Sequence, residues 1–306
     1  MSVVQEVACP MQAHPVDPLL RSDRLPHILC PGCGIGIVMH CYSHAMVESG
    51  IELRNHVCVS GIGCSGRAAG YVNIDSYHTT HGRAIPFALG VAVYNPALRV
   101  TVISGDGDLS SIGGNHLIHA ARRNVDLNIV CINNFNYGMT GGQAGPTTPL
   151  GARTSTTPFG CWERPFNLPH LAKAVGASFV ARWTVLHVRQ LKDAILHGIR
   201  KRGFTFIEVL SPCPTGFGRP NNVGDGLQEM ERYRQLCKVD HEAELGDIDI
   251  DLRDKNRPII VGNFVDVERE PFAPIVSGPV KPPRSDAGWA GVRRTTIPEE
   301  QNGVHT

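Results

Sequence analysis

Apolar residues recur along this chain with two different periods, and together they predict alternating strands and helices. Short runs of β-branched residues, typical of buried strands, are bounded by glycine, proline or asparagine. Between them lie segments whose apolar residues recur at helical spacing. The expected strands cover residues 56–60, 99–104, 127–132, 177–182 and 205–210, and the expected helices cover residues 37–47, 85–92, 109–123, 168–175 and 185–199. This alternation predicts an α/β fold with a doubly wound parallel sheet.

The pattern weakens toward both ends, which gives an expected domain division. Residues 1–26 contain four prolines and little periodicity, so we expect an extended N-terminal arm that wraps a partner subunit. Residues 27–245 form the expected α/β domain. Residues 246–306 lose the rhythm and are expected to be a C-terminal extension. Within the domain, residues 141–161 are rich in Gly, Thr and Pro, and a structureless loop of that length is usually functional or disordered.

Composition excludes several classes of protein. Of the 306 residues, 42% are hydrophobic and 19% are charged, which is ordinary for a globular protein. The net charge of +1 gives no reason to expect binding to nucleic acid or to an anionic membrane. We see no secretory signal and no apolar run of about 18 residues, the length of a membrane-spanning helix. A cytoplasmic location is therefore expected.

The most informative motif follows the strand expected at residues 99–104. It reads Gly105-Asp106-Gly107-Asp108, and the next strand ends at Asn133-Asn134. Carboxyl ends of parallel strands meet at the edge of the sheet where ligands bind. Glycines let the backbone approach a diphosphate, and carboxylate and amide oxygens suit Mg²⁺. The tetrapeptide alone could be a simple glycine-rich turn, but the asparagine pair favours a metal-bridged diphosphate site.

Four of the ten cysteines lie at predicted turns. Cys30 and Cys33 form a C-x-x-C turn, Cys64 follows the first expected strand, and Cys213 lies between two prolines after the last one. Four thiolates wrapped by irregular backbone are typical of an iron–sulfur cluster. A structural zinc ion uses the same ligands, although the compact second pair of a zinc ribbon is missing. The spacing alone leaves both alternatives open.

Taken together, these motifs resemble the β subunit of the 2-oxoacid:ferredoxin oxidoreductases, which are enzymes that use thiamine diphosphate. Gly-Asp-Gly followed by Asn-Asn resembles the signature of thiamine-dependent enzymes. The full set of matching motifs is Cys30-Pro-Gly-Cys-Gly34, Gly61-Ile-Gly-Cys64, His78-Thr-Thr-His-Gly-Arg83, Gly105-Asp-Gly-Asp108, Asn133-Asn134, Tyr137-Gly-Met-Thr-Gly-Gly-Gln143, Pro146-Thr-Thr148 and Pro212-Cys-Pro214. The resemblance covers roughly residues 25–220 and is strongest to the 2-oxoglutarate branch.

The resemblance implies a fold of the thiamine diphosphate-binding type and three cofactors: thiamine diphosphate, Mg²⁺ and a [4Fe–4S] cluster. It places the cluster on Cys30, Cys33, Cys64 and Cys213, and Mg²⁺ on Asp106, Asn134 and the backbone carbonyl of Asn136. Gly107, Asp108 and the run Thr140–Gln143 are expected along the diphosphate. The implied cofactor contacts are Ile62, Gly63, Cys64, Ser65, His81, Gly105, Asp106, Gly107, Asp108, Asn134, Tyr137, Gly138, Met139 and Thr140.

The resemblance also implies the chemistry and the partners. The expected reaction is oxidative decarboxylation of 2-oxoglutarate to succinyl-CoA, with coenzyme A as acyl acceptor and electrons passing through the cluster to ferredoxin. The glutamate that activates thiamine comes from an α (or fused α/γ) subunit in this family. The chain alone should therefore be inactive, and an (αβ)₂ assembly is expected.

Two residues are candidates for contact with the substrate. Arg67 could bind the second carboxylate of 2-oxoglutarate, because a guanidinium suits bidentate hydrogen bonds, or it could pair with an acid of the partner subunit. His81 could meet diphosphate or substrate, or serve a capping or interface role. The alternative functions are the same chemistry on pyruvate, branched-chain or indolepyruvate 2-oxoacids, and a non-catalytic iron–sulfur electron-transfer subunit.

Overall fold

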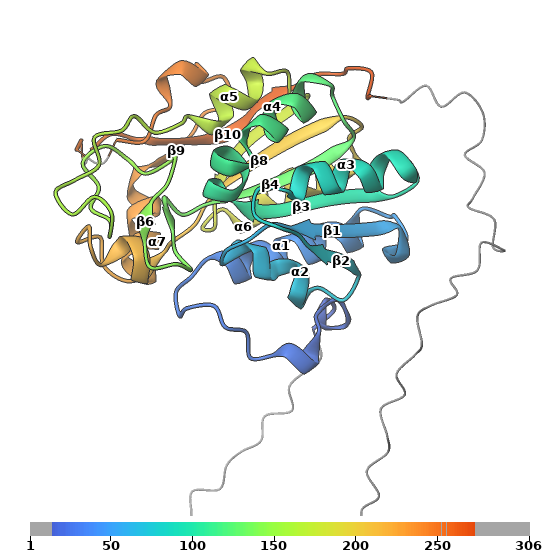
Figure 1. Cartoon of the computed structure of the whole chain (residues 1–306), viewed down its shortest axis with the longest axis horizontal. Coiled ribbons are helices and arrows are strands. Elements are labelled where there is room, and N and C mark those ends of the chain that lie inside the picture. Colours follow the sequence, from blue (N-terminus) through green and yellow to red (C-terminus); the bar gives the residue numbers. More distant parts are fainter. Residues whose placement is uncertain (1–13, 252, 255, 273–306) are drawn as a thin grey trace, which may run out of the picture. The chain divides into compact units, whose positions relative to one another are not determined.

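The computed structural model describes residues 14–251, 253–254 and 256–272, which form one compact unit built on an eight-stranded sheet (Figure 1). The strand order is β2-β1-β3-β4-β8-β7-β10-β9. The strands are β1 (His56–Ser60), β2 (Asp75–His78), β3 (Arg99–Gly105), β4 (Leu127–Asn133), β7 (Phe179–Thr184), β8 (Phe204–Leu210), β9 (Cys237–Val239) and β10 (Ile259–Asp266). The six strands from β2 to β7 in this order are parallel. The predicted doubly wound α/β sheet is confirmed.

Helices cover both faces of the sheet (Figure 1). The helices are α1 (Ile35–Glu48), α2 (Ala68–Tyr71), α3 (Ala84–Tyr94), α4 (Gly114–Arg122), α5 (Leu168–Ala174), α6 (Val188–Arg200) and α7 (Gly226–Leu236). One hydrophobic core lies under α1 and α6, and a second lies under α3, α4 and α5. Because both faces are covered, the central strands are apolar on both sides, which explains their continuous β-branched runs. None of the helices that the structure describes has the length and apolar character needed to span a bilayer.

The α/β fold extends past residue 245, where we expected the domain to end. Strand β10 lies within the expected C-terminal extension, pairs antiparallel with β7, and pairs parallel with β9. The segments on either side of β10 are rich in Pro, Arg and Asp. The apolar run Ile259–Val261 is therefore too short and isolated to predict a strand from the sequence. Residues 1–13 of the expected arm and residues 273–306 of the expected extension lie outside the described residues.

Two local features differ from the periodic pattern. Strand β2 was not predicted, because it is a mostly exposed edge strand of polar residues whose position is set by pairing with β1. The helix expected at residues 109–123 begins instead with a π-helical turn over Asp108–Ile112, and α4 follows it. Such turns are rare and are frequently found at functional sites. The segment expected to be a structureless loop contributes β6 (Gln143–Ala144), which pairs with β5 (Asn136–Tyr137).

Candidate active site

A pocket opens where the parallel strands β1, β3 and β4 end, because the segments that leave these strands curve around a common space of about 110 Å³. All fourteen predicted cofactor contacts line it, together with Asn136. The lining residues are Ile62, Gly63, Cys64, Ser65, His81, Gly105, Asp106, Gly107, Asp108, Asn134, Asn136, Tyr137, Gly138, Met139 and Thr140. The structure therefore brings together residues from four segments of the sequence around one cavity.

Asp106 is the buried carboxylate of this pocket. It follows β3, is 2% exposed, and accepts a short hydrogen bond from the hydroxyl of Thr147. Burial raises the pKa of Asp106 to about 6, although hydrogen bonds from Thr147 and from the backbone of Asn134 act in the opposite direction. A carboxylate kept this far from water is costly unless a cation compensates its charge.

Asn134 and Asn136 are presented by an unusual turn after β4. Phe135 between them has a φ of +64°, a left-handed conformation that is rare for a bulky residue. The turn is held by Thr148, whose hydroxyl donates to the Phe135 carbonyl, and by the Asn136 side chain, which donates to the Asn134 carbonyl at 2.7 Å. Strain of this kind occurs where the surrounding structure fixes a functional geometry.

The other half of the asparagine pair has a structural role. The amide of Asn133 donates to Glu208 at 2.7 Å, and its oxygen accepts from the Phe135 backbone N–H. Glu208 in turn forms a buried ion pair with Arg182 at 2.5 Å. Only Asn134 and Asn136 of this turn therefore line the pocket.

Asp108 organises the wall of the pocket rather than facing an open space. One of its oxygens lies 2.5 Å from His81 Nδ1 and accepts the backbone N–H groups of Ile62 and Gly82. The other oxygen accepts the Ser104 hydroxyl at 2.8 Å. The side chain thus ties two segments, the one after β1 and the one before α3, to the end of β3. We expected Asp108 along a diphosphate, but its carboxylate is already fully hydrogen-bonded.

The predicted substrate residues occupy different environments. His81 lines the pocket, with its ring edge-on to Tyr137 at a centroid distance of 6.3 Å. Arg67 is exposed on the short helical turn after Cys64 and is not among the lining residues. In the run Thr140–Gln143, only Thr140 lines the pocket. The Gln143 side chain is instead hydrogen-bonded to Thr140.

The four predicted cluster cysteines lie close together beside the pocket. A methyl group at Gly138 would lie 3.3 Å from Cys213 Sγ and 3.6 Å from Cys64 Sγ. The pKa of Cys33 is raised to about 11, mainly by burial and in part by the neighbouring thiols of Cys213, Cys64 and Cys30. Cys64 and Gly138 also line the cavity, so the cysteine group and the pocket share a wall.

Backbone and hydroxyl donors face these sulfurs. The backbone N–H groups of Gly216 and Phe217 point toward Cys213, and the Thr215 hydroxyl donates to Cys30 Sγ at 3.8 Å. All three donors come from the π-helical turn at Pro214–Gly218. Hydrogen bonds to sulfur are characteristic of iron–sulfur sites and tune their potentials.

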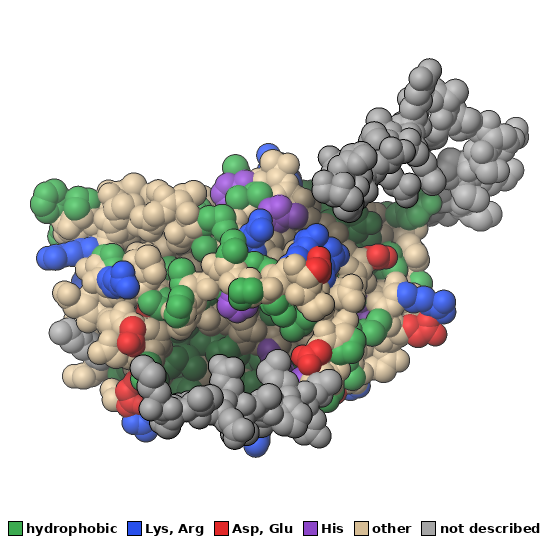
Figure 2. All heavy atoms as spheres, turned by 90° about the horizontal axis from the view of Figure 1, so that it is seen from below, with side chains coloured by type: hydrophobic (Ala, Val, Ile, Leu, Met, Phe, Trp, Pro, Cys, Tyr) green, Lys and Arg blue, Asp and Glu red, His purple; other side chains and the backbone are tan. Residues whose placement is uncertain are grey.

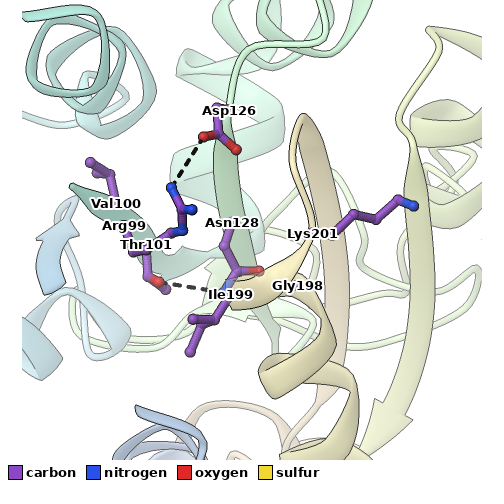
Figure 3. A pocket seen from close by; sticks show the side chains of 8 residues that line it. All are labelled: Arg99, Val100, Thr101, Asp126, Asn128, Gly198, Ile199 and Lys201. Carbon is purple, nitrogen blue, oxygen red and sulfur yellow. Dashed lines mark hydrogen bonds and ion pairs between the residues drawn. The ribbon is translucent and has the colours of Figure 1, made fainter. Parts of the chain in front are cut away.

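A second pocket lies at the other end of the strands, where β3 and β4 begin, and it is too small to hold a ligand (Figure 3). It is lined by Arg99, Val100, Thr101, Asp126, Asn128, Gly198, Ile199 and Lys201. Its space is about 10 Å³, which holds at most one water molecule. Arg99 lies 3.7 Å from Asp126, and Asn128 bridges to Thr101, so these side chains form a structural polar cluster.

Sequence reasoning gave no role to three hydroxyls that hold the site. Thr147 and Thr148 support Asp106 and the strained turn, and Ser104 supports Asp108. The motif Pro146-Thr-Thr148 was recognised, but nothing in its spacing shows which carboxylate or carbonyl each hydroxyl reaches. The position of Ser104, a polar residue directly after the apolar pair Val102-Ile103 at the end of a strand, could have indicated its role.

Comparison with known proteins gives consistent results. Residues 61–209 match the family described as the thiamine pyrophosphate enzyme, C-terminal TPP binding domain. The chain is 48% identical over 265 residues to the 2-oxoglutarate synthase subunit KorB of Methanocaldococcus jannaschii, covering 85% of this chain and 94% of that protein. It is 42% identical over 186 residues to the 2-oxoacid:ferredoxin oxidoreductase 2 subunit beta of Aeropyrum pernix, covering 61% and 60%.

A solved structure resembles most of the chain. It is the 2-oxoglutarate:ferredoxin oxidoreductase from Magnetococcus marinus with 2-oxoglutarate, coenzyme A and succinyl-CoA bound. The TM-score is 0.74 at 30% sequence identity, and the match covers 86% of this chain and 89% of that one.

Proposed function

Since the chain belongs to the family of 2-oxoacid:ferredoxin oxidoreductase β subunits, as its motifs predicted, we propose that it is the catalytic β subunit of a 2-oxoglutarate:ferredoxin oxidoreductase. The proposed reaction converts 2-oxoglutarate and coenzyme A to succinyl-CoA and CO₂, with two electrons passing to ferredoxin. One observation carries the proposal: the cysteine group and the pocket share the wall formed by Cys64 and Gly138. A cofactor in the pocket can therefore pass electrons directly to a cluster on the cysteines.

The pocket fits thiamine diphosphate bridged to the protein by Mg²⁺. Asp106 supplies a buried carboxylate whose raised pKa indicates an uncompensated charge, and Asn134 lies beside it. Asp106, Asn134 and the Asn136 carbonyl would hold the ion, which neutralises both carboxylate and diphosphate. When bound, thiamine diphosphate supplies the carbanion chemistry that removes CO₂ from a 2-oxoacid. The chain's own contribution is to bind and orient it.

The four cysteines fit a cluster better than a single zinc ion. No three of these sulfurs lie within 4.8 Å of one another. A tetrahedral zinc site with 2.3 Å bonds would bring its sulfurs to about 3.8 Å from one another. A cluster of four irons and four sulfides needs the wider opening, and the N–H donors at Cys213 suit its sulfurs. Cys30, Cys33, Cys64 and Cys213 would hold it.

His81 is the titratable side chain best placed to act on the substrate. Asp108 accepts from Nδ1 and so fixes the tautomer in which Nε2 carries a lone pair. Within the described part of the chain, Nε2 has no hydrogen-bond partner, which leaves it free to hold a proton at the reacting end of the substrate. This assignment makes Asp108 a positioning residue.

Selection of 2-oxoglutarate is proposed to involve Arg67. Its guanidinium is exposed, and it pairs with no acidic side chain among residues 14–251, 253–254 and 256–272. It follows Cys64 by three residues, so the assembled enzyme can direct it toward the far carboxylate of the substrate. A bidentate pair with that carboxylate would favour 2-oxoglutarate over pyruvate.

The pocket needs a partner subunit to be complete. Its described lining contains no glutamate, whereas thiamine enzymes use one to activate the aminopyrimidine. We therefore expect an α (or fused α/γ) subunit to supply it, in an (αβ)₂ assembly that reduces ferredoxin. A cytoplasmic location is part of the same proposal, because a reducing compartment keeps the four thiols available.

Anaerobic reconstitution of the chain with its α partner tests the function. The complex should reduce ferredoxin with 2-oxoglutarate and coenzyme A, whereas the chain alone should not. Pyruvate, branched-chain 2-oxoacids and indolepyruvate are the alternative substrates, and a higher kcat/KM for any of them would contradict the assignment. Arg67→Ala should lower the preference for 2-oxoglutarate over pyruvate, and an unchanged preference would exclude the proposed role of Arg67.

Cofactor analysis of the anaerobically purified complex is an independent test. About four irons, four sulfides and one thiamine diphosphate are expected per chain. Zinc without sulfide would contradict the cluster assignment, and iron with sulfide but no thiamine would indicate an electron-transfer subunit.

A further inference from the structure

Three histidine rings converge on the surface, and none of them lines the candidate active-site pocket. His40 and His44 are one turn apart on α1, and His14 comes from the segment that precedes the first helix. One ring nitrogen from each lies within 4.8 Å of those of the other two, and the ring centroids are 4.5–5.4 Å apart. Figure 2 views the side on which α1 and the N-terminal segment lie, and histidine side chains reach the surface there.

The side chains of these histidines are largely free to bind an ion. His14 Nδ1 accepts the backbone N–H of Val16 at 3.4 Å, a long hydrogen bond that His14 would give up on binding an ion. The side chains of His40 and His44 make no hydrogen bond with any described residue, so their convergence with His14 is otherwise unexplained.

We propose that His14, His40 and His44 form a binding site for a divalent transition-metal ion, with Zn²⁺ as the favoured ion. Imidazole is a preferred ligand of Zn²⁺, and a pair of histidines four residues apart on a helix presents two nitrogens to one ion. Three protein ligands leave a fourth tetrahedral position for water.

Small side-chain movements are enough to close the site. Bonds of 2.0–2.1 Å in a tetrahedron place the nitrogens about 3.3 Å apart, compared with the present limit of 4.8 Å. His40 and His14 are exposed and His44 is half-buried, so no core packing opposes rotation of these rings. The backbone N–H of His14 already donates to Asp17 at 2.7 Å, which holds the third ligand near the other two.

A metal at this position would join the N-terminal segment to helix α1 at the surface, above the buried contacts that they already share in one hydrophobic core. His14 lies in the N-terminal segment, in which Val16 and Leu19 are buried. His40 and His44 lie on α1, which begins directly after Cys33. The ion would therefore fasten the N-terminal segment to the helix that supports the C-x-x-C turn. Any ligand that binds only the folded state adds stability in proportion to the logarithm of its concentration over Kd.

Co²⁺ titration of the full-length chain, with its iron–sulfur cluster loaded under anaerobic conditions, tests this site. Loading occupies the cysteine thiolates, so added Co²⁺ should bind once per chain with d–d absorption and no thiolate-to-cobalt charge-transfer band. Zn²⁺ should displace it. His40→Ala and His44→Ala should each weaken binding at least about tenfold, because each loses one of three bonds.

Two further variants sharpen the test. His14→Ala removes the ligand from the other segment and should weaken Co²⁺ binding to a similar extent, whereas a helical pair acting alone would be unaffected by it. His170→Ala removes an exposed histidine from α5 and should bind Co²⁺ as the unaltered chain does. Co²⁺ binding that is unchanged in all four variants, or that shows only thiolate bands, would overturn the proposal. None of these outcomes depends on activity, so the result stands apart from the proposed reaction.

Discussion

Asp106 and Asp108 lie on one turn, two residues apart, and are equally buried, but their charges are compensated in different ways. Asp108 receives hydrogen bonds from Ser104 and two backbone N–H groups and adjoins His81. Asp106 has Thr147 as its side-chain donor, and its pKa is raised to about 6 by burial. One carboxylate is therefore part of the scaffold, while the other carries a buried charge at a cost to stability, as the proposed metal-binding role of Asp106 requires.

This difference predicts opposite effects of the same substitution. Asp106→Asn should raise the free energy of unfolding of the metal-free chain at pH 7 by about 1–3 kcal/mol. The substitution removes a carboxylate that is charged at pH 7 although burial favours its neutral form. Asp108→Asn should lower the same quantity by about 1–3 kcal/mol, because it disrupts a satisfied buried network. Urea unfolding measures both. A loss of stability in Asp106→Asn would show that its charge is already compensated.

Binding should separate the two variants from the unaltered chain in a second way. Asp106→Asn should abolish Mg²⁺-dependent binding of thiamine diphosphate in calorimetry despite the stability gain. Retained binding would remove Asp106 from the proposed metal site.

His56 gives a pH dependence of known sign. It is fully buried at the start of β1, with Nε2 3.3 Å from the Ser49 hydroxyl and Nδ1 without a described partner. Burial lowers its pKa below the usual 6.5, and the charge of Arg99 acts in the same direction. As the pH falls below about 6.5, His56 takes up a proton in the unfolded chain but not in the folded chain. The free energy of unfolding therefore decreases with falling pH, by up to about 1.4 kcal/mol per pH unit.

The variant His56→Asn isolates this contribution. The thermal midpoint of the unaltered chain should fall more steeply between pH 7.5 and 5.5 than that of the variant, since Asn does not titrate. Parallel pH profiles would mean that His56 does not set the acid sensitivity.

Residue types in the pocket were predictable from the sequence, whereas their division of labour was not. The positions of Gly105–Asp108 and Asn134 follow from strand ends meeting at one edge of a parallel sheet. Which carboxylate faces the cavity depends on side-chain directions that are fixed by distant hydroxyls such as Thr147. Spacing carries no information about those contacts.

At the scale of elements, the pocket depends on close approach between its glycine-rich connections. A methyl group at Gly61, just after β1, would lie 1.9 Å from an Asp108 oxygen. The carboxylate cannot retreat without giving up His81 and Ser104. The two connections therefore fit together only with glycine at this position.

Gly61→Ala should lower the free energy of unfolding by about 1–3 kcal/mol through overpacking. It should also weaken thiamine diphosphate binding at least about tenfold, because Asp108 and His81 shift. Gly90→Ala is the matched control: Gly90 is in α3 with open space around it, so Ala should add about 0.5–1 kcal/mol of stability. Thermal unfolding and calorimetry measure both, and equal behaviour of the two variants would contradict the predicted contact.

The predictable elements are those whose burial leaves a period in the sequence. Strands β3, β4 and β8 are apolar on both faces, and their predicted bounds are correct to within a residue. Strand β2 is polar because it is an exposed edge, and β10 has polar flanks. Both are fixed by pairing with distant strands, which a local pattern cannot reveal.

Across the whole molecule, one buried ion pair joins the sheet to its C-terminal part. Arg182 on β7 pairs with Glu208 directly opposite on β8, and its guanidinium also donates to the Ile248 carbonyl at 2.8 Å. Glu208 holds Asn133 at the end of β4. The pair thus connects three strands with the segment that leads to β10.

Breaking this pair from one side should be severe. Glu208→Leu should cost about 3–5 kcal/mol, because it leaves the Arg182 charge buried without compensation. The double variant Arg182→Met/Glu208→Leu should be less destabilised than Glu208→Leu, since it leaves no lone charge. Urea midpoints of the single and double variants decide this, and a larger loss in the double variant than in Glu208→Leu would contradict the cost assigned to the lone Arg182 charge.

The strand order also has a kinetic consequence. The centre of the sheet forms when β4 pairs with β8, and residues 134–203 separate these two strands in the sequence. Parallel pairings between such distant segments form slowly. Cys213 lies just beyond β8, so it reaches Cys30, Cys33 and Cys64 only after that pairing. During synthesis, Cys30, Cys33 and Cys64 are therefore made before Cys213 can join them. In the proposed holoenzyme, cluster insertion follows closure of the sheet, and a protein that delivers the cluster has to recognise the folded chain rather than the nascent one.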